Sequence, residues 1–75
     1  MSKDDTVYEV LVEVTGKDRS EIAESMDLVA DLNIDSPDAL RLLVALEDKL
    51  GIEISDEDAA GMETVKDILE YVRGT

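Results

Sequence analysis

Residues 36–51 read Ser36-Pro37-Asp38-Ala39-Leu40-Arg41-Leu42-Leu43-Val44-Ala45-Leu46-Glu47-Asp48-Lys49-Leu50-Gly51. This segment predicts an amphipathic α-helix that ends before its glycine. At about 100° per residue, four leucines share one arc, which we expect to face the core: Leu42, Leu43, Leu46 and Leu50. Asp35 or Ser36 can cap the helix, and Pro37 suits its first turn because no helical N–H group is lost there.

Three more helices are predicted on either side of this one. Apolar residues at helical spacing predict the first, from Asp4 to Val14, with Gly16 as its stop. A strand is the alternative there because β-branched residues are frequent, but no later segment offers a strand to pair with it. Ser55 can cap a short helix that ends near Gly61. Thr64 begins the last helix, and its inner face contains Val65, Ile68, Leu69 and Val72.

A long connection, from Lys17 to Asp35, joins the first two helices. Its scattered apolar residues indicate that it packs on the core, and a single helical turn is expected over Met26 to Ala30. From the length of 75 residues, we expect residues 1–75 to form one domain. We expect an all-α fold, a four-helix bundle with a long loop between helices one and two and a short third helix.

The charge of the chain is strongly negative. Twenty acidic residues face seven basic ones among 75 residues, for a formal net charge of −13. Such a surface repels nucleic acids and anionic lipids, and it attracts partners that carry basic patches. Acidity that only keeps the protein soluble is the alternative. High charge can also indicate disorder, but 44% of residues are hydrophobic and many recur periodically, which favours a folded chain.

The composition also indicates the cellular compartment in which we expect the protein. The chain contains no cysteine, which excludes disulfides and thiolate metal sites and suits a reducing compartment. The first residues lack the apolar core of a signal peptide, and no apolar run approaches the ~20 residues of a membrane span. We expect a cytoplasmic monomer that binds neither nucleic acid nor membrane.

Several residue types that enzymes and metal sites commonly use are missing, and the abundant carboxylates are expected by chance on any acidic surface. Without His or Cys, the chain has neither the common general base nor the thiol nucleophile, and it has no glycine-rich phosphate loop. Asp31-Leu32-Asn33-Ile34-Asp35 fits the opening of an EF-hand loop. Ser36 stands where that loop needs glycine and Leu42 where it needs glutamate, so we expect no metal site and no enzyme.

The run Asp31-Leu32-Asn33-Ile34-Asp35-Ser36, followed by an amphipathic helix, resembles the acyl carrier protein family, whose pattern is D-L-G-x-D-S-L. The likeness continues from Leu46 to Asp58, against L-E-x-x-[FL]-x-x-x-I-x-D-E-[DE]. Thr64-Val65 and the helix after it resemble the family's closing T-V…Y-[IV] segment. The pattern covers nearly the whole chain without an internal gap.

The resemblance implies that Ser36, next to Asp35, carries 4′-phosphopantetheine through a phosphodiester. A phosphopantetheinyl transferase would attach the group from coenzyme A. The thiol at its end would hold an acyl thioester for fatty-acid, lipid or polyketide-type biosynthesis. The alternatives are an aminoacyl, peptidyl or D-alanyl carrier of the same fold, and an unmodified acidic interaction module.

The resemblance also implies two sets of contact residues. Those that would meet basic patches on acyl-transferring, acyl-activating or condensing enzymes are Pro37, Asp38, Leu40, Arg41, Val44, Glu47, Asp48, Asp56 and Glu57. Those that would line an acyl cavity are Leu46, Ile54, Met62, Val65 and Ile68. Plain core packing is the other interpretation of the second set.

Three residues depart from the family pattern. Asn33 replaces a glycine, which costs little because asparagine tolerates a left-handed backbone. Pro37 replaces a Leu or Met, and Arg41 replaces an acid. Reversing a charge at the rim of a contact should repel a generic basic partner and favour one with an acid at that point. We therefore hypothesise a specialised carrier, with neutral drift as the alternative.

Overall fold

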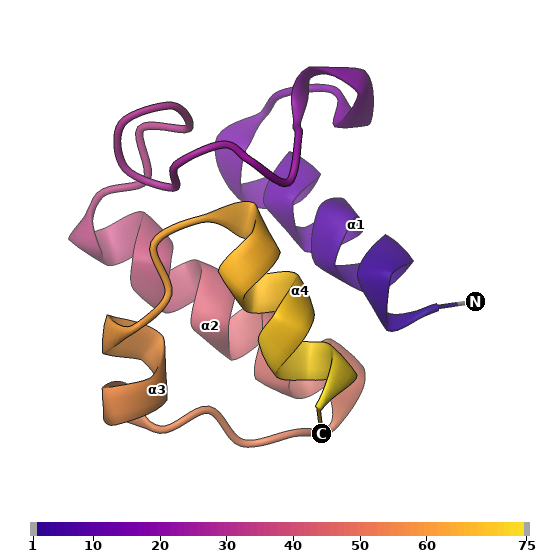
Figure 1. Ribbon diagram of the computed structural model, residues 1–75, viewed down its shortest axis with the longest axis vertical. Coiled ribbons are helices and arrows are strands. Elements are labelled where there is room, and N and C mark those ends of the chain that lie inside the picture. Colours follow the sequence, from indigo (N-terminus) through magenta and orange to yellow (C-terminus); the bar gives the residue numbers. More distant parts are fainter. Residues whose placement is uncertain (1, 75) are drawn as a thin grey trace.

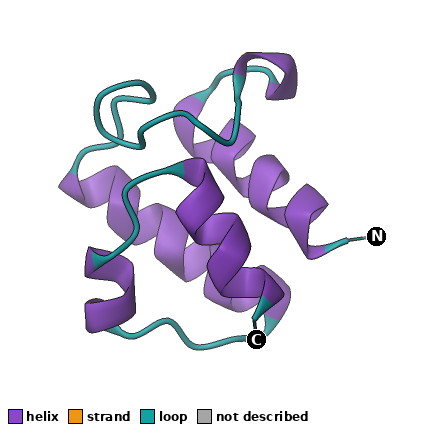
Figure 2. Cartoon of the chain, viewed as in Figure 1, coloured by secondary structure: helices purple, strands orange, loops and turns teal. Residues whose placement is uncertain are grey.

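A computed structural model describes residues 2–74, which fold into four α-helices and one 3₁₀ turn (Figures 1 and 2). The elements are α1 (Lys3–Thr15), η1 (Arg19–Glu21), α2 (Ser36–Leu50), α3 (Asp56–Ala60) and α4 (Val65–Arg73). In this part of the chain the single β-type contact is an isolated bridge between Asp27 and Thr64. The predicted all-α fold and its four helices are confirmed.

Each helix begins at a side chain that accepts a hydrogen bond from the first turn. Ser2 caps α1, Ser55 caps α3, and Thr64 caps α4 in a reciprocal capping box with Asp67. At α2 the cap is Asp35, whose Oδ1 accepts the Asp38 N–H at 3.1 Å. Of the two caps that the sequence allowed, the structure therefore uses the aspartate and leaves Ser36 inside the first turn.

The first two long helices end at glycines in the left-handed conformation. Gly16 has φ 73° after α1 and Gly51 has φ 66° after α2. Their N–H groups donate to the carbonyls of Val12 and Glu47, which closes the last turn of each helix. Both predicted stops are confirmed.

The core is wholly apolar in the described residues. It contains Val7, Val10, Leu11, Ile22, Leu28, Leu32, Ile34, Leu42, Leu46, Val65, Ile68, Leu69 and Val72. The predicted inner face of α4 is buried in full. On α2, Leu42 and Leu46 are buried, whereas Leu43 and Leu50 are only partly covered. Leu50 lies in the last turn of its helix, and Leu43 borders a hollow beside α2.

The long connection packs on the core, but its local structure differs from the prediction. A series of turns covers residues 28–32, where a helical turn was expected over 26–30, and the 3₁₀ turn at η1 was not predicted. The Asp27 carboxylate accepts the N–H groups of Val29 and Ala30, and such side-chain bonds compete with a regular helix. Backbone bonds from Leu28 to Glu63 and from Val65 to Met26 tie the connection to the start of α4.

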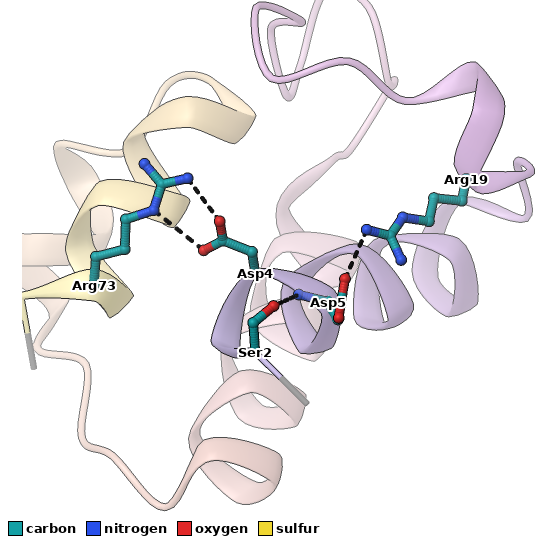
Figure 3. A network of polar contacts seen from close by, with 5 residues as sticks. All are labelled: Ser2, Asp4, Asp5, Arg19 and Arg73. Atoms are coloured by element: carbon teal, nitrogen blue, oxygen red, sulfur yellow. Dashed lines mark hydrogen bonds and ion pairs between the residues drawn. The ribbon is translucent and has the colours of Figure 1, made fainter.

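A polar network joins α1 to the end of α4 and to η1 in the connection (Figure 3). The Arg73 guanidinium donates from Nη2 and Nε to the Asp4 carboxylate, at 2.7 and 3.2 Å, and so joins the end of α4 to the start of α1. Arg19 donates to Asp5 at 2.8 Å and also lies over the Tyr8 ring. The Asp4 carboxylate raises the pKa of Arg73, and the Arg19 guanidinium lowers the pKa of Asp5. The network holds the connection and α4 against α1.

Candidate functional site

Ser36 is the exposed first residue of α2. Because Asp35 caps the helix and its carbonyl accepts the Ala39 N–H at 2.8 Å, the serine hydroxyl is not needed for capping. Within residues 2–74 the Ser36 hydroxyl has no hydrogen-bond partner. It is therefore an accessible alcohol at the positive end of a 15-residue helix, where a phosphate is favoured.

In the segment that precedes Ser36, buried residues alternate with exposed ones. Leu32 and Ile34 are buried, whereas Asn33 and Asp35 are exposed. Asn33 has φ 56°, which confirms the left-handed backbone that we expected asparagine to tolerate. The Ile34 N–H donates to the Leu28 carbonyl at 2.9 Å. The buried Leu32 and Ile34 thus anchor the loop and leave Asp35 and Ser36 on the outside.

A hollow of about 90 Å³ lies beside α2. Its lining is entirely apolar: Leu28, Val29, Ile34, Ala39, Leu42, Leu43, Ala59, Met62 and Ile68. Ala39 and Leu43 follow Ser36 by three and seven residues, so all three lie on one side of the helix. The hollow and the serine therefore share a face of α2.

The structure places two of the five residues predicted for an acyl cavity in the lining of the hollow and three outside it. Met62 and Ile68 line the hollow. Leu46 and Val65 lie outside it, fully buried among core side chains, and Ile54 lies half-buried in the segment that follows α2. The sequence did not identify the residues that the connection contributes, Leu28, Val29 and Ile34. Their apolar character inside an otherwise polar loop was the available signal.

The outward face of α2 carries the centre of the predicted partner surface. Leu40 and Val44 are 64% and 54% exposed. They line a shallow groove with Arg41, Ala45 and Asp48. Such exposed apolar side chains, ringed by charge, are typical of a contact surface. Four of the predicted partner residues are thus neighbours in space.

The remaining predicted partner residues lie around this groove or away from it. Pro37 is exposed in the first turn of α2, and the Asp38 carboxylate lies 3.7 Å from the Arg41 guanidinium. Asp56 and Glu57 are exposed at the start of α3. Glu47 differs from them because its carboxylate accepts the Ile54 N–H at 2.9 Å and so fixes the segment between α2 and α3.

Val29 is an exposed apolar residue that the sequence pattern did not single out. It is 68% exposed and also lines the hollow, so it marks a place where the hollow reaches the surface. Neighbouring aspartates lie on either side of it, and both bind the backbone. Asp31 accepts the Asp27 N–H at 2.7 Å, and Asp27 accepts those of Val29 and Ala30.

Neither a metal cluster nor a membrane span is present in the part of the chain that the structure describes. No group of three or more acidic side chains there is arranged to hold a metal ion. None of the helices in this part has the length and apolar character that a bilayer crossing requires.

Comparisons with known proteins show which family the chain is similar to. Residues 5–72 match the family described as "Phosphopantetheine attachment site". The acyl carrier protein of Chlamydia caviae is 41% identical over 73 residues, which cover 97% of this chain and 95% of that protein. The meromycolate extension acyl carrier protein of Mycobacterium tuberculosis is 43% identical over 67 residues, which cover 89% of this chain and 58% of that protein.

Solved structures have the same fold. A Mycobacterium tuberculosis protein described as a putative acyl carrier protein superposes with a TM-score of 0.89 at 30% identity, over 96% of each chain. The acyl carrier protein of Enterococcus faecalis gives a TM-score of 0.76 at 29% identity, over 96% of this chain and 95% of its own.

Proposed function

Because the chain belongs to the acyl carrier protein family, we propose that Ser36 is the residue that holds its 4′-phosphopantetheine group. Members of this family are carriers and not enzymes, and the group is attached covalently. The observation that carries the proposal is the free hydroxyl at the start of α2, which Asp35 releases from capping. The group supplies a reactive thiol that a chain without cysteine lacks.

The phosphate of that group suits the place where Ser36 lies. The first turn of α2 presents the positive end of its dipole, and Ser36 is exposed, with no hydrogen bond to its hydroxyl among residues 2–74. Asp35, as the cap, holds the first turn in place through the Asp38 N–H. We assign Asp35 a positioning role beside the attachment point.

The cargo that this site favours is an acyl chain, not an aminoacyl group. Every residue that lines the hollow is apolar, so a hydrocarbon chain can be sheltered there. An ammonium group would find no side-chain acceptor in such a lining, and burying it unpaired is costly. Fatty-acid or related long-chain synthesis is therefore the pathway class that we propose, with an aminoacyl cargo as the alternative.

The partners that we propose are a phosphopantetheinyl transferase and acyl-handling enzymes with basic patches. Leu40 and Val44 would form the apolar centre of the contact. Asp38, Asp48, Asp56 and Glu57 would form an acidic rim that speeds encounter at low salt. Glu47 would contribute charge only in part, because its carboxylate already binds the Ile54 N–H.

Pro37 and Arg41 support a specialised set of partners within this class. Both are exposed, and Arg41 borders the apolar groove. To test this, the native chain and a Pro37→Leu, Arg41→Glu double variant are compared in modification and acylation by generic fatty-acid enzymes. We expect the double variant to react faster. Equal rates would remove the hypothesis and leave neutral drift.

Intact mass tests the attachment site directly. The chain is incubated with coenzyme A, magnesium and a transferase. We expect the native chain to gain one phosphopantetheine and Ser36→Ala to gain none. Ser20→Ala is the matched control, because Ser20 is another exposed serine, in η1, that caps no helix and should leave the modification unchanged. Failure of several transferases to modify the native chain would favour an unmodified interaction module.

The thioester recovered from the native host then decides the cargo. An acyl chain without an amine is the expected result. An aminoacyl or D-alanyl group would overturn the acyl assignment while leaving Ser36 as the attachment site.

A further inference from the structure

Met62 lies between two spaces of opposite character. On one side it lines the apolar hollow beside α2. On the other side it lines an open groove between α3 and α4, whose remaining residues are Glu57, Asp58, Gly61, Asp67, Glu70 and Tyr71. The half-buried Met62 side chain thus separates a dry space from a wet, acidic one.

Three other residues that line the hollow form a firmer wall. Ile34, Leu42 and Ile68 are at most 4% exposed and belong to the central core. Moving any of them would disturb the packing of the bundle. Met62 follows the short α3, and a methionine side chain can adopt several shapes at little cost. We therefore expect Met62 to move aside more easily than Ile34, Leu42 or Ile68.

The helix that precedes Met62, α3, is held in place partly by hydrogen bonds at the protein surface. α3 has five residues and none of them is buried. The Tyr71 hydroxyl on α4 lies 3.0 Å from the Asp58 carboxylate and 3.2 Å from the Glu53 carbonyl, and it donates its proton to one of them at a time. Tyr71 thereby keeps α3, and with it Met62, against the hollow.

We propose that Met62 is the end wall that limits how long an acyl chain the hollow shelters. This inference rests on the proposed acyl carrier function. An acyl chain that ends at Met62 stays in apolar surroundings. A longer chain displaces the thioether and emerges beside Asp58, Asp67 and Glu70, where further methylenes meet water and gain nothing from burial.

The test uses the full chain loaded on Ser36 with saturated acyl groups from butyryl to palmitoyl. The unfolding equilibrium in urea is measured for each. Each sheltered methylene should raise the folding constant by about fourfold, and the gain should stop at the length that fills the hollow. In Met62→Ala this break should move to longer chains by about three carbons, because the substitution removes about three heavy atoms. In Met62→Phe it should move to shorter chains.

Met26→Ala is the matched control. Met26 is also a half-buried methionine packed on the core, but it lies outside the hollow. In Met26→Ala the gain in stability should therefore stop at the same acyl-chain length as in the native protein. If Met62→Ala is too unstable without cargo, Met62→Val should show a smaller shift in the same direction. The proposal is overturned if the break stays in place in the Met62 variants, if Met26→Ala shifts it equally, or if stability never depends on chain length. Failure to load any acyl group on Ser36 is read separately by mass and would defeat the carrier function itself.

Discussion

Asn33 sets the direction in which the chain enters α2. Its φ of 56° lies in the left-handed region, which costs a residue with a Cβ about 1 kcal/mol or more unless, like asparagine, it tolerates that conformation. We therefore predict that Asn33→Ala lowers the free energy of unfolding by about 1 kcal/mol, whereas Asn33→Gly leaves it equal or higher. Urea unfolding of the three proteins measures this. An alanine variant as stable as the glycine variant would contradict the backbone explanation.

At the same scale, the sequence located some site residues and not others. The places of Ser36, Leu40 and Val44 on α2 could be predicted from helix geometry, because they depend only on one regular helix, whereas the role of Ser36 was implied by the family resemblance. The lining of the hollow could not, because it depends on how the connection folds across α2. Leu46 was expected in the cavity but lies in the core, while Leu43, on the preceding turn of the same helix, borders the hollow instead.

At the level of a single helix, the capping box of Thr64 and Asp67 stabilises the start of α4. The Asp67 carboxylate accepts the N–H groups of Glu63 and Thr64, and these bonds lower its pKa below the ordinary 3.8. A lowered pKa in the folded state means that the ionised carboxylate stabilises the fold above pH ~4 and loses this effect as the pH falls through the folded value. We predict that Asp67→Asn lowers Tm at pH 7 and that its deficit relative to the native chain shrinks as the pH falls below about 4.

Asp18→Asn is the control for that measurement. Asp18 precedes η1, yet its side chain makes no capping hydrogen bond there. Both substitutions remove one negative charge, so the general relief of repulsion is shared. Thermal melts from about pH 7 to about pH 3 should show the pH-dependent deficit in the Asp67 variant alone, and parallel curves would refute the capping explanation.

The helices themselves were predictable because their ends are determined by local chemistry. Gly16 and Gly51 stop the long helices, and Ser55 and Thr64 start the short ones. The connection was not, because its turns are set by Asp27 bonding to its own backbone and by pairing with residues near Thr64. Contacts between segments distant in sequence leave no periodic signal in either one.

The whole molecule is small compared with the distance over which its charges repel one another at low salt. Its radius of gyration is 11.0 Å and its formal net charge is −13. The screening length is about 30 Å at 0.01 M salt and about 10 Å at 0.1 M, so at low salt nearly all acidic residues repel one another across the fold. Only seven basic residues are available to offset twenty acids.

We predict that Tm rises with salt over this range, and that magnesium acts at lower concentrations than sodium. Ion pairs such as Arg73–Asp4 and Arg19–Asp5 should weaken in salt, but they are few and the repulsion is general. Differential scanning calorimetry over a salt series measures the balance. A Tm that is flat or falls with salt would show that the ion pairs outweigh the repulsion.

The contact between Asp4 and Arg73 also decides how the protein can be handled. It holds the two ends of the described chain on one side of the fold, whereas α2 begins on the opposite side (Figure 1). A tag, a resin or a second domain attached through either end would therefore lie far from Ser36. Immobilised or fused in this way, the protein should still present its serine to an approaching enzyme.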